Sequence, residues 1–84
     1  MRTLPTFVVP GDPITLLAWC DVCLRWLRHG RAGHSVRAQN FGWRTVHCAD
    51  GGVSYLLVNC GEATAEDMRD AKRRKPRGPQ RFAA

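Results

Sequence analysis

Apolar residues gather in three stretches of the 84-residue chain, and the first of these is strongly amphipathic. Between residues 13 and 29, the polar positions share one narrow sector of a helical wheel: Asp21, Arg25, Arg28 and His29. Asp12 before Pro13 is typical of a helix start, and Gly30 is typical of a helix end. The pattern therefore predicts an amphipathic helix over residues 13–29.

The other two apolar stretches, 41–48 and 53–60, flank the turn sequence 49–52 and predict a β-hairpin. Pairing Cys48 with Val53 gives the face expected to meet the core: Phe41, Trp43, Thr45, Leu56, Val58 and Cys60. Thr64 and Asp67 have the spacing of a capping box, which predicts a short basic helix over residues 65–75. These elements together predict an α+β fold in which the first helix packs on the hairpin.

The composition divides the chain into three regions. Residues 1–12 contain Pro5, Pro10 and Gly11 and are expected to form an extended arm. Residues 13–67 are expected to form the compact core, and residues 68–84 the end of the basic helix and a disordered tail. A core of only about 55 residues often needs a metal ion, a disulfide or a partner for stability.

The net charge of +6 indicates a polyanionic partner, because the basic residues form two blocks. The first block lies in a stretch without acidic residues, and the second lies near the C-terminal end. Trp43 beside Arg44 has the composition of a stacking and phosphate contact. The candidate nucleic-acid-binding residues are Arg25, Arg28, Arg37, Trp43, Arg44, Arg73, Arg74, Lys75 and Arg77. An acidic protein surface is the alternative partner, and a merely solubilising tail is the alternative role of the second block.

The cysteines, spaced C-x2-C-x24-C-x11-C, are typical of a zinc site. Cys20 and Cys23 would share an ion from adjacent turns of the predicted helix. Cys48 and Cys60 would lie about 23 Å apart on a regular hairpin, so either the hairpin is shorter than expected or only one of them joins that pair. The predicted ligands are Cys20, Cys23 and Cys60, with Cys48 or His34 completing the site, or with His47 and Cys48 as the alternative.

Two other interpretations of the cysteines remain. The segment Trp19-Cys20-Asp21-Val22-Cys23 resembles the W-C-x-x-C signature of the thioredoxin superfamily. This resemblance implies that Cys20 is a nucleophile and Cys23 a resolving thiol. Alternatively, the cysteines pack in the core as small apolar residues.

The sequence thus predicts a small zinc-stapled module that binds nucleic acid without catalysis, since it contains no phosphate loop, deaminase motif or triad pattern. The alternatives are a protein-binding regulator or inhibitor that docks on a larger complex, and a dithiol redox protein. A signal-peptide pattern and a membrane-length apolar stretch are both missing from the sequence. The expected location is therefore the cytoplasm, where thiols stay reduced.

Overall fold

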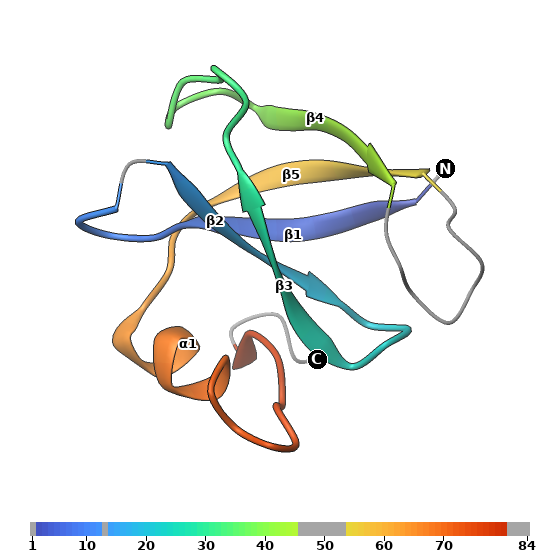
Figure 1. Ribbon diagram of the computed structural model, residues 1–84, viewed down its shortest axis with the longest axis vertical. Helices are drawn as coiled ribbons and strands as arrows, with labels where there is room; N and C mark the ends of the chain where they lie inside the picture. Colours follow the sequence, from blue (N-terminus) through green and yellow to red (C-terminus); the bar gives the residue numbers. More distant parts are fainter. Residues whose placement is uncertain (1, 13, 46–53, 81–84) are drawn as a thin grey trace.

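The computed structural model describes residues 2–12, 14–45 and 54–80. In these ranges the chain forms five strands and one helix: β1 (Thr3–Val8), β2 (Thr15–Cys20), β3 (Arg25–Gly30), β4 (Asn40–Thr45), β5 (Ser54–Glu62) and α1 (Ala65–Asp70). The strands form one sheet in the order β3-β2-β1-β5-β4. Neighbouring strands are antiparallel except β1 and β5, which are parallel. The sheet curls into a half-barrel, so that β3 crosses in front of β1 and β5 (Figure 1).

The inner face of the half-barrel holds the main core. Its buried members are Leu4, Val8, Leu16, Ala18, Cys20, Phe41, Tyr55 and Leu57. The strand registers bring them together, because Val8 lies opposite Leu16 and residue 4 lies opposite residue 57. Since successive side chains of a strand point to opposite faces, every second residue of the central strands enters this core.

A second apolar cluster lies on the outer face of β1 and β2, where α1 and the following segment cover it. Its buried members are Phe7, Val9, Leu17 and Ala63, with Trp26, Cys60, Met68 and Ala71 packed against them. The helix and the segment after it lie beside the lower part of the sheet in Figure 1. Strand β2 is therefore buried on both faces.

The predicted helix over residues 13–29 is wrong, and with it the α+β fold of a helix packed on a hairpin. These residues form the antiparallel strands β2 and β3, in which Trp19 lies opposite Trp26. Burial on both faces explains the misleading pattern of β2, because such a strand is apolar at every position and lacks alternation. Asp12 does not cap a helix, and its carboxylate accepts a hydrogen bond from the Ile14 amide at 3.2 Å in a turn.

Residues 3–8 and 71–80 also differ from the expected arm and disordered tail. Residues 3–8 form β1, the central strand of the sheet. Residues 71–80 follow a helix that ends at Asp70, well before the expected residue 75, and they pack against the sheet. The capping box that begins this helix, Thr64 with Asp67, is confirmed.

The two strands of the predicted hairpin, β4 and β5, pair antiparallel as expected, but most of the side chains predicted to meet the core lie on the outer face. Thr45 lies opposite Ser54, a shift of two residues from the expected register that leaves each strand's faces unchanged. The buried residues of β5 are Tyr55 and Leu57, so Leu56 and its partner Trp43 lie on the outer face. Phe41 is buried in the inner core as predicted, because the register shifts between Asn40 and Trp43. The turn 49–52 and the pairing of Cys48 with Val53 lie outside the described residues.

A hydrogen bond across the inner face joins two strands that are not neighbours in the sheet. The His29 Nε2 atom on β3 lies 2.7 Å from the Tyr55 hydroxyl on β5, and Tyr55 is fully buried. Burial, followed by the positive charge of Arg44, lowers the pKa of His29 below its ordinary value of 6.5. Burial also raises the pKa of Tyr55. The contact therefore holds the half-barrel closed with a neutral imidazole.

We expect stability to fall on mild acidification because of His29. The unfolded chain, with the ordinary pKa of 6.5, binds a proton at a higher pH than the folded chain does. The contribution of His29 to the free energy of unfolding is therefore complete above about pH 6.5, and it is lost progressively as the pH falls through the lowered pKa. Urea unfolding measured between pH 8 and pH 5 should show this decline, and His29→Gln should flatten it. An equal decline in the variant would contradict the assignment.

Candidate nucleic-acid interface

The basic C-terminal segment is placed by α1, whose first turn is fixed by reciprocal hydrogen bonds. The Thr64 hydroxyl accepts from the Asp67 amide at 3.1 Å, and the Asp67 carboxylate accepts from the Thr64 amide at 2.8 Å. The negative charge of Glu66, also in the first turn, interacts favourably with the positive end of the helix dipole. A helix of only six residues needs such support, because isolated short helices are marginal in water.

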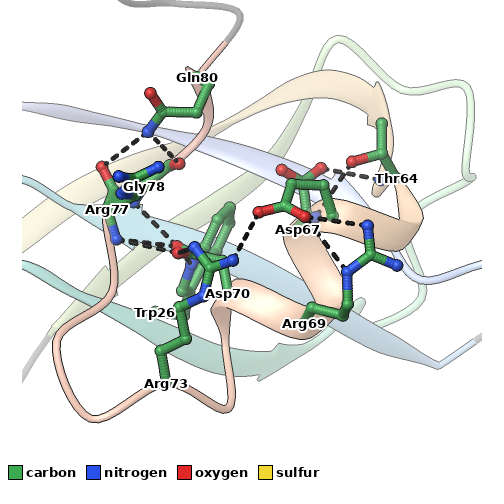
Figure 2. A network of polar contacts seen from close by, with 10 residues as sticks. Trp26, Thr64, Asp67, Arg69, Asp70, Arg73, Arg77, Gly78 and Gln80 are labelled. Atoms are coloured by element: carbon green, nitrogen blue, oxygen red, sulfur yellow. Dashed lines mark hydrogen bonds and ion pairs between the residues drawn. The ribbon is translucent and has the colours of Figure 1, made fainter.

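Asp70, the last residue of α1, fixes the segment that follows it. Its buried carboxylate accepts hydrogen bonds from the Trp26 indole N–H at 2.8 Å and from the Gly78 amide at 2.9 Å. It also accepts from the Arg77 amide at 3.0 Å and from the Arg73 guanidinium at 3.0 Å. Figure 2 shows these donors converging on one side chain from β3 and from the segment 73–78. We call residues 71–80, held in this way, the clasped segment.

The donors keep Asp70 ionised despite its burial. Burial alone would raise the pKa of this carboxyl. The hydrogen bonds from Arg77, Trp26 and Gly78, together with the charge of Arg73, outweigh that effect and lower the pKa below its ordinary value of 3.8. The carboxylate therefore carries its full charge at neutral pH, and charge-assisted hydrogen bonds of this kind are stronger than neutral ones.

Glycine is required at position 78 because the backbone there lies on the Trp19 indole. A Cβ added to Gly78 would lie 2.6 Å from Trp19 Cε2, and Gly78 has a φ of +84°. Pro79 beside it is also buried. Gln80 donates weaker hydrogen bonds from its side-chain amide to the carbonyls of Arg77 and Gly78, as Figure 2 shows. The clasped segment is thus anchored by packing as well as by Asp70.

The basic residues from Arg69 to Arg77 fall into two groups in the structure. Arg69 and Arg73 pair with Glu66 at 2.9 and 3.0 Å, and Arg73 also pairs with Asp70. The other four within the described residues are exposed, and no described acidic side chain lies within ion-pair distance of them: Lys72, Arg74, Lys75 and Arg77. The first group holds the segment together, and the second presents positive charge to solvent.

The remaining predicted basic residues are spread over other parts of the molecule. Arg25 and Arg28 are exposed on β3, an edge strand, where charged side chains also discourage pairing with another chain. Arg37 is exposed in the connection between β3 and β4. Arg44 is half-buried and donates to the Phe41 carbonyl at 2.9 Å, so it serves the fold. Trp43 is 54% exposed on β4.

The cysteines are not brought together as the zinc prediction requires. Cys20 ends β2 and is buried in the inner core, whereas Cys60 packs against the outer cluster. Cys23 is disulfide-bonded, which differs from the expectation of reduced thiols. Cys20, Cys23 and Cys60 therefore do not fit one ion.

No group of three metal-binding side chains occurs in the described part of the chain. His34, a candidate fourth ligand, has its Nε2 atom 3.1 Å from the position of a Cβ on Gly42, and so it packs against β4. Cys48 and His47 lie outside the described residues, and zinc binding stays a prediction.

The thioredoxin-like interpretation loses its structural basis as well. The resemblance implies that the first cysteine opens a helix, but Cys20 closes a strand and Cys23 lies in the turn between β2 and β3. The Cys20 sulfur accepts hydrogen bonds from the Arg2 guanidinium at 3.2 Å and from the Cys23 amide at 3.4 Å. Cys20 is fully buried, which removes it from contact with a substrate disulfide.

No protein-family model matches the chain, and neither a curated protein nor a solved structure matches it significantly. The function is therefore argued from the residues themselves. Among the described helices, none is long and apolar enough to cross a membrane.

Sequence reasoning missed Asp70, Trp26 and Gly78 as the residues that shape this surface. Asp70 and Trp26 are 44 positions apart, a contact that no local pattern reveals. Two weak signals were present. Asp70 is the last acid before a long run of cations, and glycine beside proline at 78–79 is typical of a fixed turn.

Asp70→Asn should release the clasped segment, because an amide carries no charge and offers one acceptor in place of two. The loss of buried hydrogen bonds of this kind costs about 1–3 kcal/mol. Trypsin should then cleave within residues 72–77 about 5- to 100-fold faster, since cleavage follows the population of the open form. Asp21→Asn, on an exposed carboxylate, is the matched control and should leave the rate unchanged. Equal cleavage of Asp70→Asn and the original chain would contradict the role of Asp70.

Proposed function

We propose that the protein is a non-catalytic module that binds nucleic acid through the clasped segment. The observation that carries this proposal is the group of four exposed cations without an acidic partner in the described structure: Lys72, Arg74, Lys75 and Arg77. They lie within six consecutive residues that are fixed against the sheet. A fixed array of cations loses less conformational entropy on binding a phosphate backbone than a mobile tail does.

The charge distribution supports the proposal. The chain carries 13 basic and 7 acidic residues, and Glu66 and Asp70 are already engaged by Arg73 of the clasped segment. Positive charge therefore dominates the surface of the clasped segment. Contacts of this type release counterions from nucleic acid, so the affinity depends steeply on salt. The cytoplasmic location stays a prediction, and the disulfide at Cys23 argues against it because cytosolic thiols are kept reduced.

A second candidate function, docking on a larger protein, is favoured by one feature. The turn between β2 and β3 exposes two apolar side chains, Val22 at 50% and Leu24 at 61%. Leu24 has a φ of +54°, so the turn presents its side chain in a fixed and strained conformation. An exposed apolar tip of this kind is typical of a protein contact.

Arg74→Gln/Lys75→Gln should weaken nucleic-acid binding and reduce its salt dependence. Removing two phosphate contacts should lower the slope of log K against log salt by about 1.5 for a single strand. Fluorescence anisotropy with a labelled single-stranded RNA across a salt series measures both quantities. Arg69→Gln is the control, because Arg69 is already paired with Glu66 at 2.9 Å.

Two results would contradict the proposal. One is the absence of binding by the original chain even at low salt. The other is a loss of nucleic-acid affinity per removed charge that is as large for Arg69→Gln as for the double variant. Such a result would mean that binding follows the net charge of the protein and not the exposed cations of the clasped segment.

A further inference from the structure

A strip of exposed and half-buried side chains runs across the outer face of β4, β5 and β1. Trp43 lies opposite Leu56, and Leu56 lies opposite Thr3, so these three form one row over three strands. Tyr55 and Leu57, on either side of Leu56, are buried in the inner core. Because side chains alternate along a strand, the row of Leu56 must point outward.

The next row extends the strip with two more apolar side chains and ends at Asn40 on β4. Val58 lies opposite Pro5, on the same outer face as Leu56 and Thr3. Among the described residues, none of these side chains belongs to the cluster that α1 covers. Trp43, at 54% exposure, is the most accessible aromatic residue in the described part of the chain. We call Thr3, Pro5, Trp43, Leu56 and Val58 the outer strip.

An open cleft of about 330 Å³ connects the outer strip to the clasped segment. Thr3 and Pro5 line one side of it, and Arg77, Pro79 and Gln80 line the other, with Trp19 between them. The same two β1 residues therefore belong to the strip and to the cleft. The volume is at the small end of the range for ligand sites, about 300–1,000 Å³.

The distances suit a short stretch of polynucleotide. Neighbouring strands lie about 4.8 Å apart, so Trp43 on β4 is about 10 Å from Thr3 on β1 across the sheet. The cleft and Arg77 follow directly beyond Thr3. The surface thus offers an aromatic ring at one end and cations at the other, with apolar side chains in between.

We infer that the outer strip and the cleft bind single-stranded nucleic acid, with a base stacked on Trp43 and the backbone held by Arg77 and its basic neighbours. A duplex hides its base faces, and only an unpaired base can lie flat on an indole ring. The combination of a cationic groove and an aromatic platform is the physical basis of binding to single strands without sequence preference. The inference rests on the proposed function and adds the strandedness of the ligand.

One acidic side chain borders this path. Asp21 lines the cleft, and its carboxylate lies 3.5 Å from the Arg2 guanidinium. The ion pair offsets the negative charge that would otherwise repel a phosphate. Asp21→Asn should therefore change the single-strand affinity by less than about threefold.

The test compares a labelled oligouridine with a labelled RNA hairpin duplex. Trp43→Ala should weaken binding of the oligouridine about 5- to 100-fold and leave that of the duplex within about twofold, because it removes only the stacking contact. Trp43→Phe keeps an aromatic ring and should retain most of the single-strand affinity. Val22→Ala, at an exposed apolar residue in the turn between β2 and β3, is the matched control and should have no effect.

Intrinsic fluorescence provides a second measurement that does not depend on Trp43→Ala. Oligouridine should quench the tryptophan emission of the original chain, and the quenching should fall in Trp43→Phe although binding persists. Trp19 also lines the cleft, so the quenching that remains in Trp43→Phe is assigned to Trp19, whose side chain is only 9% exposed. Unchanged quenching in Trp43→Phe would overturn the role of Trp43.

The outcomes separate this inference from the proposed function. If Arg74→Gln/Lys75→Gln weakens binding and Trp43→Ala does not, the strip is no nucleic-acid site and the proposed function stands. If Trp43→Ala weakens duplex and single strand equally, stacking of an unpaired base is overturned. If neither probe binds the original chain, the proposed function and this inference both fail, and a protein partner becomes the expected occupant of the outer strip.

Discussion

The buried Asp70 carboxylate is the interaction on which the functional surface depends. Its donors come from the Trp26 indole on β3 and from the backbone amides of Arg77 and Gly78, so it joins the sheet to the end of the chain. An unpaired buried charge would be costly, but these donors and the Arg73 guanidinium satisfy the Asp70 carboxylate. The network converts a run of cations, which alone would remain mobile, into a surface with a defined shape.

The half-barrel provides the platform for that clasp. Strand β2 and the second half of β1 are buried on both faces, so the small domain forms two apolar clusters on the two faces of one sheet. The inner cluster is closed by the bond between His29 and Tyr55, and the outer one is covered by α1 and the clasped segment. The part of the outer face that α1 leaves uncovered is the outer strip. The same covering that stabilises the fold therefore also sets the limits of the proposed binding surface.

Local patterns were read correctly from the sequence where the deciding contact was local. Thr64 and Asp67 are three residues apart, and their capping box was predicted together with the start of α1. The pairing of β4 with β5 was also predicted, although not which face meets the core. Residues 15–20 were misread as helix because a strand buried on both sides shows no alternation. The clasped segment was expected to be disordered because its order depends on Trp26, far away in the sequence. The four exposed cations of the clasped segment that have no acidic partner in the described structure include three of those predicted to bind nucleic acid, Arg74, Lys75 and Arg77.

Amide hydrogen exchange at Arg77 and Gly78 tests the central claim most directly. Both residues lie outside any helix or strand, and their amides are bonded to Asp70 at 3.0 and 2.9 Å. The account predicts that both amides exchange far more slowly than in an unstructured peptide and that Asp70→Asn abolishes the protection. Exchange of both amides at the rate of an unstructured peptide in the original chain would contradict it, because the clasped segment would then be an ordinary mobile tail.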